Sequence, residues 1–395
     1  MSASNQTQQV PPPPRPRQQR GLKAFWVRVT EGLQVQELWG QFKSEARESY
    51  DLYSKDVDWE ALKQERSRFK RAMHSGWAIF QAMLMKLTPA RRVLLLLALA
   101  LLIFRPDFKS GHDEYGFDFG LFGAVILFVL LALELADRVT MKRDLEIARE
   151  IQQWLVPNAP PNIPGVDIAF ATRPQNTVAG DYYDAFLRPD LDASGQPAAP
   201  RLLVAVADVA GKSVPAALLM ATFQSGLRAL SGTAASLAEI VTGLDRYARA
   251  HSLEGRRFTT AFLAEIDLNT RKMRYTNCGH NDPILRRASG TIERLAVGGP
   301  PLGLPLFTDH EIDYRSAEVQ LQPGDLLFVF TDGVVEAINE RGEEFKEIRL
   351  FGSLESAAQG NAQQVLSRVM ADVNTFVGYA RQHDDITALV LRVTA

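Results

Sequence analysis

The chain has 395 residues, with 44 Lys and Arg against 46 Asp and Glu and a formal net charge of −2. This length exceeds a single typical hydrophobic core, so two or more structural units are expected. The near-neutral charge excludes a strongly polycationic nucleic-acid-binding protein, and we expect no nucleic-acid partner. The single cysteine excludes an intramolecular disulfide and fits a cytosolic functional domain.

The N-terminal part of the chain shows no catalytic pattern. Residues 1–20 lack the apolar core of a signal peptide and contain a Pro run, which predicts a disordered Pro-rich tail. Residues 21–90 are charged, with aromatic residues at helical spacing. We therefore expect a helical region there, of unknown role.

Two unbroken apolar runs follow, of 12 residues at 93–104 and 15 residues at 119–133. At about 1.5 Å per residue, each is shorter than a roughly 30 Å hydrocarbon core, which favours a buried hairpin in a soluble protein. Against this, neither run carries a polar side chain, whereas a core helix normally keeps one wet face. Two interpretations therefore stay open: a buried helical hairpin in a soluble protein, or a hairpin that spans a membrane.

The distribution of basic residues favours the membrane. Eight Lys or Arg lie at 63–92 and four at 138–149, whereas the connecting loop has only Arg105 and Lys109. Such asymmetry predicts that both flanks are cytoplasmic. We expect a two-helix transmembrane hairpin at 91–136 in contact with membrane lipid, in a multi-pass protein of the bacterial inner (cytoplasmic) membrane. Both termini and the C-terminal domain would be cytoplasmic.

Residues 137–156 are expected to form a linker helix. Its apolar residues fit heptad core positions, with Gln152 as the polar exception: Met141, Leu145, Ala148 and Leu155. Heptads predict pairing with a second copy, giving a homodimer. The alternative, that this helix packs on the following domain, stays open.

From residue 157 onward, short apolar runs are broken by Gly, Pro and Asn, which is typical of strands joined by turns. Strands are expected at 201–209, 258–267, 272–279, 325–333 and 386–393. Helices are expected at 215–231, 236–251 and 361–377, and hairpin turns at 267–270 and 288–291. Strand groups separated by helix groups predict an α+β layered sandwich over 157–395.

Aspartates stand beside several of these strands. Asp208 and Asp332 follow apolar runs, Asp384 and Asp385 precede one, and Asp181 follows a glycine. If these carboxylates converge on one rim of the sandwich they repel each other, and a divalent cation with oxygen ligands removes the repulsion. Each Asp taken alone is an ordinary turn or cap residue. The pattern by itself leaves both interpretations open.

A family resemblance decides between them. The segments GDYYDAF, VAVADVAGKSVPAALLMA, NCGHNDPIL, PPLGL, FTDGVVEA and HDDITALVL occur in this order. Together they resemble the bacterial branch of the metal-dependent PPM (protein phosphatase 2C-like) family, typified by stage II sporulation protein E and the sigma-B regulator phosphatases. The resemblance covers about residues 145–395 and leaves the N-terminal third outside.

The resemblance implies an α-β-β-α sandwich holding two Mn²⁺ or Mg²⁺ ions, which hydrolyses phosphoserine or phosphothreonine on a protein. It implies these metal ligands: Asp181, Asp208, the carbonyl of Val209, Asp332 and Asp384. Asp208 would bridge the metals, so Asp208 and Asp332 are the expected catalytic residues. Asp385 is the second choice to Asp384.

The resemblance also bears on other charged groups. No Lys or Arg lies at 176–186, so a metal is the expected counter-charge for Asp181 and Asp184. His280 and Cys278 are expected to be structural. Lys212 is expected to be solvated, with attraction of phosphate as the alternative. His383 is likewise expected to be structural. The proton donor to the leaving group stays unassigned, because Ala210 and Gly211 stand where eukaryotic relatives have a His.

Two functions follow from the sequence. The first is a membrane-anchored phosphatase acting on a phosphorylated protein, with an anti-sigma-factor antagonist as the substrate type that the resemblance implies. The second is a catalytically inactive phosphoprotein-binding scaffold. The full set of four acids favours the enzyme, because a scaffold has no chemical need for it.

Overall fold

The structure is a computed structural model that describes residues 57, 59, 68–104, 118–191, 197–233, 236–251, 257–304 and 312–394. The chain divides into two compact units, Met1–Ala136 and Asp137–Ala395. The expected Pro-rich tail, most of the region 21–67 and the loop with Arg105 and Lys109 lie outside the described residues.

The described part of the first unit is helical, as the sequence predicts. Its helices are α4 (Arg68–Lys86), α5 (Pro89–Phe104) and α6 (Phe119–Leu155), the last of which continues into the second unit. α5 and α6 pack closely at Gly123, where an added Cβ would lie 2.9 Å from the carbonyl oxygen of Ala98. Arg91 and Glu134 join the same two helices by an ion pair of 3.2 Å. The two apolar runs thus form a packed helix pair.

Within the described residues, α6 is the one helix long and apolar enough to cross a membrane. Its apolar side chains are exposed, Phe128 to 70% and Leu131 to 66%, which is unlike the buried face of a soluble core helix. α5 has 16 residues, fewer than the about 20 that a span needs. The predicted two-pass hairpin is therefore not supported.

The second unit contains two β-sheets, in which every described strand pair is antiparallel except that of β5 and β8. The five-stranded sheet has the order β1-β11-β10-β6-β7, and the six-stranded sheet has β2-β3-β4-β5-β8 with β9 paired to β5. The strands are β1 (Val166–Arg173), β2 (Tyr182–Leu191), β3 (Pro197–Val209), β4 (Thr259–Asp267), β5 (Lys272–Cys278), β6 (Ile284–Arg286), β7 (Ile292–Arg294), β8 (Gly298–Gly299), β9 (Ala317–Gln320), β10 (Leu326–Phe330) and β11 (Ile386–Val393).

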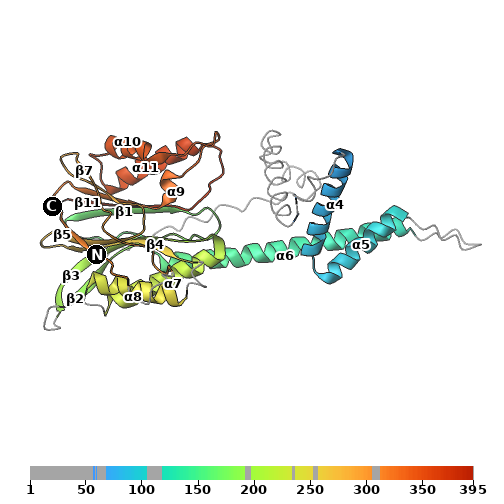
Figure 1. Cartoon of the computed structure of the whole chain (residues 1–395), viewed down its shortest axis with the longest axis horizontal. Helices are drawn as coiled ribbons and strands as arrows, with labels where there is room; N and C mark the ends of the chain where they lie inside the picture. The colour runs from blue at the N-terminus through green and yellow to red at the C-terminus, as the bar shows by residue number, and fades with distance from the viewer. Residues whose placement is uncertain are drawn as a thin grey trace, which may run out of the picture. The chain divides into compact units, whose positions relative to one another are not determined.

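Helices cover the outer faces of both sheets, as Figure 1 shows. They are α7 (Ser213–Ser231), α8 (Leu237–Ala250), α9 (Asp332–Val335), α10 (Lys346–Ser356) and α11 (Ala362–Val377). One core, with Leu203 and Leu227, joins the six-stranded sheet to α7 and α8. Another, with Phe328 and Val369, joins the five-stranded sheet to α10 and α11. A third lies between the sheets, so the layers run helix, sheet, sheet, helix and the predicted α+β sandwich is confirmed.

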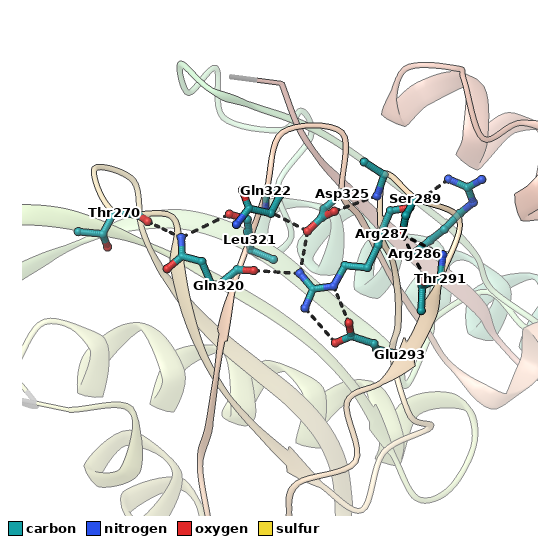
Figure 2. A network of polar contacts seen from close by, with 11 residues as sticks. Thr270, Arg286, Arg287, Ser289, Thr291, Glu293, Gln320, Leu321, Gln322 and Asp325 are labelled. Atoms are coloured by element: carbon teal, nitrogen blue, oxygen red, sulfur yellow. Dashed lines mark hydrogen bonds and ion pairs between the residues drawn. The ribbon is translucent and has the colours of Figure 1, made fainter.

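A polar network fixes two turns at one end of the five-stranded sheet (Figure 2). Arg287 donates from Nε to Glu293 Oε1 at 2.6 Å and from Nη1 to Asp325 Oδ2 at 2.8 Å. The buried Asp325 also accepts the backbone N–H groups of Ala288 and Gln322, each at 3.0 Å. The turn predicted at 288–291 is thereby held against the turn that leads into β10.

The linker part of α6, residues 137–155, belongs to the second unit and packs on the sandwich of that unit. Leu145, Ala148 and Leu155 are half-buried, and Gln152 bonds to the backbone of Ala179. This is the packing alternative that the sequence left open. The fourth heptad residue, Met141, is 61% exposed, and further exposed apolar residues of the helix are Ile147, Ile151 and Trp154.

Candidate active site

Antiparallel pairing brings the predicted acids together. Asp181 precedes β2 and lies beside Asp208 near the end of β3, because these strands form one hairpin. Asp332 follows β10 and Asp384 precedes β11, and these strands are also antiparallel neighbours. Thr331 Oγ1 donates to Asp181 Oδ2 at 2.9 Å and so connects the two sheet edges. One rim of the sandwich therefore carries all four carboxyl groups.

Burial and mutual repulsion make these carboxyl groups hard to ionise together. Burial, followed by repulsion from Asp332 and Asp384, raises the pKa of Asp208 to about 7. Burial and neighbouring carboxylates also raise the pKa of Asp332 to about 6. Burial, with repulsion from Asp208, raises the pKa of Asp181 well above its ordinary value. A cluster of this kind holds protons at neutral pH or takes up a cation instead.

The donor set of the rim fits a hard divalent ion, since it consists of carboxylate oxygens. Among the residues that the structure describes, no three His, Cys, Asp or Glu side chains are close enough to hold a metal ion as they stand. Without a shared cation these carboxylates repel one another. A positively charged side chain of the protein also lies at this rim and offsets part of that repulsion.

That positive group is Lys212, whose Nζ lies 3.1 Å from Asp384 Oδ2 and also donates to the carbonyl oxygen of His383. The Lys212 side chain is 51% exposed and so is solvated as expected, but it also has a carboxylate partner. The neighbouring Asp385 has a different role. It accepts the backbone N–H of Gln175 at Oδ1 and that of Gly180 at Oδ2, both at 2.6 Å. Asp385 is thus occupied by the loop that leads to β2, whereas Asp384 faces Lys212.

Asp184 has a protein counter-charge rather than a metal. Its fully buried carboxylate accepts from Arg228 Nε and Nη2 of α7, both at 2.9 Å, and from the Tyr182 hydroxyl at 2.5 Å. The Arg228 guanidinium also lies 3.7 Å from the centroid of the Phe186 ring. The expectation of a metal beside Asp184 is therefore wrong, because α7 returns across the outer face of the sheet and supplies the cation.

The remaining motif residues are structural. His280 is buried, with Nδ1 3.0 Å from Thr260 Oγ1, and burial lowers its pKa to about 4. Cys278 is fully buried, and burial raises the pKa of its thiol. A neutral thiol and a neutral imidazole inside the fold do not serve as nucleophile or acid at this rim.

A cavity of about 270 Å³ opens beside the acids. Its charged lining consists of Arg173, Lys212, Glu336, Glu344 and Asp384. The cavity is thus bounded by Asp384 on one side and by Gly333 of α9 on another.

Comparison with known proteins supports the sequence resemblance. Residues 199–394 match the family described as stage II sporulation protein E (SpoIIE). The chain is 26% identical over 253 residues to the phosphoserine phosphatase RsbU of Bacillus subtilis, covering 64% of this chain and 70% of RsbU. This chain carries a PPM-type phosphatase domain of the SpoIIE branch.

Two further similarities show how much of the chain is shared with other proteins, in sequence and in fold. Protein IcfG of Synechocystis sp. is 27% identical over 288 residues, covering 66% of this chain but 43% of IcfG. The SiaA-PP2C domain of Pseudomonas aeruginosa superposes with a TM-score of 0.54 at 22% identity, covering 65% of this chain and 98% of that domain. The chain thus spans less than half of IcfG, and the likeness to SiaA-PP2C shows the fold.

Sequence reasoning missed three side chains that shape the site of the phosphatase domain. The sequence places Arg228 in a predicted helix and Gln152 at a polar heptad position without indicating a partner for either, and it indicates no carboxylate partner for Lys212. The first two contact partners 44 and 27 residues away. No local pattern points to such pairs, whereas the presence of Lys212 directly after the "ADVAG" motif was a signal that could have been used.

Proposed function

We propose that the protein is a metal-dependent serine/threonine phosphatase that hydrolyses a phosphorylated protein in bacterial signalling. One observation carries the proposal: Asp181, Asp208, Asp332 and Asp384 lie at one rim, with the pKa values of Asp208 and Asp332 raised to about 7 and about 6. The family match of residues 199–394 supports the same reaction.

Five oxygen donors would hold the metal, and we propose two Mn²⁺ or Mg²⁺ ions. They are the carboxylates of Asp181, Asp208, Asp332 and Asp384 and the carbonyl oxygen of Val209. We assign the ligand at the "HDDIT" motif to Asp384 rather than Asp385. Both oxygens of Asp385 accept backbone N–H groups of the loop that leads to β2, whereas Asp384 accepts one backbone N–H at Oδ1 and faces the movable Lys212 side chain at Oδ2.

The chain's own groups prepare the rim for phosphate. Asp208 and Asp332, the proposed catalytic residues, would hold the divalent ions next to the position where the phosphoryl group binds. When bound, divalent ions screen the phosphoryl oxygens and activate a water molecule as nucleophile, which is the expected contribution for a slowly hydrolysing monoester. Lys212 would turn from Asp384 toward the phosphoryl group once the carboxylate binds a cation. Thr331 keeps Asp181 oriented through its 2.9 Å hydrogen bond.

The similarity to the phosphoserine phosphatase RsbU supports phosphoserine on a regulatory protein as the substrate. We propose an anti-sigma-factor antagonist as the substrate type, in line with the family resemblance. The 270 Å³ cavity beside Asp384 offers room for a residue next to the phosphorylated side chain.

We propose that the first unit anchors the protein in the bacterial inner membrane, with the phosphatase domain cytoplasmic. The exposed apolar side chains of α6, such as Phe128 at 70%, support contact with lipid. Retention of the full chain in the membrane pellet after alkaline carbonate washing tests this. Release into the supernatant would mean that α6 does not insert.

A homodimer through the linker also belongs to the proposal, with a changed contact surface. The heptad residue Gln152 packs on the chain's own domain, so we place the dimer seam on Ile147, Ile151 and Trp154, which are 46%, 50% and 80% exposed. If Ile151→Glu with Trp154→Glu leaves the sedimentation mass of the detergent-solubilised chain unchanged, this seam is wrong.

The phosphatase activity is tested by p-nitrophenyl phosphate hydrolysis with the full chain in detergent. We expect turnover with Mn²⁺, and its loss with EDTA or in Asp208→Asn. If the wild-type chain shows no turnover with Mn²⁺ and binds no Mn²⁺ by calorimetry, the enzyme is refuted and the phosphoprotein-binding scaffold is favoured.

A further inference from the structure

The loop at 175–181, which leads to Asp181, forms hydrogen bonds at three of its backbone positions with side chains from other parts of the domain. Asp385 binds its two ends, at the N–H groups of Gln175 and Gly180. Between them, the carboxamide of Gln152 binds Ala179 in both directions. Its Nε2 donates to the Ala179 carbonyl oxygen at 2.7 Å, and its Oε1 accepts the Ala179 N–H at 3.0 Å.

This arrangement couples a helix to a carboxylate. Gln152 belongs to α6, whereas Ala179 is separated from Asp181 only by Gly180. Gly180 has little room to move, because an added Cβ would lie 3.1 Å from the Ala216 Cβ and 3.3 Å from the Val209 carbonyl oxygen. A shift of Ala179 therefore passes to Asp181 rather than being absorbed by the backbone between them.

We propose that Gln152 is a positioning residue for the metal site. Its two hydrogen bonds seat the 175–181 loop, so that the affinity of Asp181 for a divalent cation depends on the contact between α6 and the phosphatase domain. This inference rests on the proposed function. It also explains why a polar residue interrupts the apolar face of the linker helix, since no apolar side chain satisfies both the N–H and the C=O of a half-buried peptide group.

The adjacent Gln153 provides a matched control, because it is exposed and is the same residue type on the same helix turn. The variants are Gln152→Ala, Gln152→Glu and Gln153→Ala in the full detergent-solubilised chain. Gln152→Glu keeps an acceptor for the Ala179 N–H but replaces the donor with a charge facing the carbonyl oxygen, and it therefore tests the pair of bonds without creating a cavity.

The first readout is independent of metal and catalysis. Hydrogen exchange of the peptide spanning 175–181, measured in EDTA, should become faster in Gln152→Ala and Gln152→Glu and stay at the wild-type rate in Gln153→Ala. Unchanged exchange in both Gln152 variants overturns the proposal. So does acceleration of the same size throughout the domain, which would indicate general destabilisation.

The second readout is Mn²⁺ affinity by calorimetry, together with the Mn²⁺ dependence of p-nitrophenyl phosphate hydrolysis. Loss of two neutral hydrogen bonds is expected to weaken Mn²⁺ binding about tenfold, while KM for the phosphate ester at saturating Mn²⁺ stays within about twofold. A Gln152→Ala protein with wild-type Mn²⁺ affinity, or a Gln153→Ala protein equally weakened, overturns the proposal. If wild-type protein binds no Mn²⁺ but the exchange result holds, the proposed function fails and the metal part of this inference fails with it, whereas the loop contact stands.

Discussion

The buried pair between Asp184 and Arg228 allows a quantitative test of how α7 is held on the sheet. Replacing Arg228 with Met removes two hydrogen bonds of 2.9 Å and leaves the fully buried Asp184 carboxylate with its hydrogen bond from the Tyr182 hydroxyl. Breaking a buried ion pair from one side costs about 3–5 kcal/mol. The Arg228 side chain is 42% exposed, so water screens part of this, and we expect a loss of about 2–3 kcal/mol.

The assay is thermal unfolding of the full chain in detergent, followed by the near-ultraviolet circular dichroism of the phosphatase domain. For a domain of this size, the expected loss corresponds to a Tm lower by about 4–10 °C. Arg368→Met is the matched control, because Arg368 forms an exposed i,i+4 pair with Asp372 at 2.9 Å. Such a pair contributes about 0.5 kcal/mol or less, so its loss should lower Tm by about 2 °C at most.

A second substitution separates the charge from the packing. Asp184→Asn removes the buried charge and keeps an acceptor for the Tyr182 hydroxyl, so Arg228→Met combined with Asp184→Asn should be more stable than Arg228→Met alone by at least about 1 kcal/mol. A double variant no more stable than the single one, or an Arg228→Met protein as stable as Arg368→Met, would refute the reasoning that Asp184 needs a protein cation.

Three other predictions concern separate parts of the domain. Asp325→Ala should lower stability by about 2–4 kcal/mol in thermal unfolding, because the N–H groups of Ala288 and Gln322 lose their acceptor and Arg287 loses one of its ion pairs while keeping Glu293. Its catalytic activity should persist, since the network lies about 20 Å along β10 from Asp332; loss of activity at a temperature where the variant is folded would contradict this. His280 has a folded pKa of about 4, below its unfolded value of about 6.5, so the unfolded state binds the proton first as pH falls. Between pH 7 and pH 5 the wild type should lose about 2 kcal/mol more stability in urea titrations than His280→Gln, and parallel pH profiles would contradict the assignment. Lys212→Met should strengthen Mn²⁺ binding up to about fivefold by calorimetry, because the competing charge at Asp384 is removed, and should lower kcat/KM; weaker Mn²⁺ binding would be inconsistent with that ion pair.

Much of the fold was predictable because its elements carry local patterns. The long strands at 201–209, 258–267 and 386–393 and the helices α7, α8 and α11 were predicted within a few residues. The short strands β6 to β9 have between two and four residues each, too few for periodicity to show. β1 and β2 were also missed, although β2 begins directly after Asp181.

The sequence by itself determined which acids to expect together, because Asp181, Asp208, Asp332 and Asp384 stand in ordered motifs that resemble a known family, and the structure places them at one rim. Only the tertiary structure decided what each charge faces. Asp385 binds the loop that begins 210 residues earlier, Asp184 is paired with Arg228 on α7, and Gln152 reaches Ala179 from α6. The physical reason is that strand and helix patterns depend on neighbours within a few residues, whereas the partner of a buried charge depends on which segments the two sheets bring into contact.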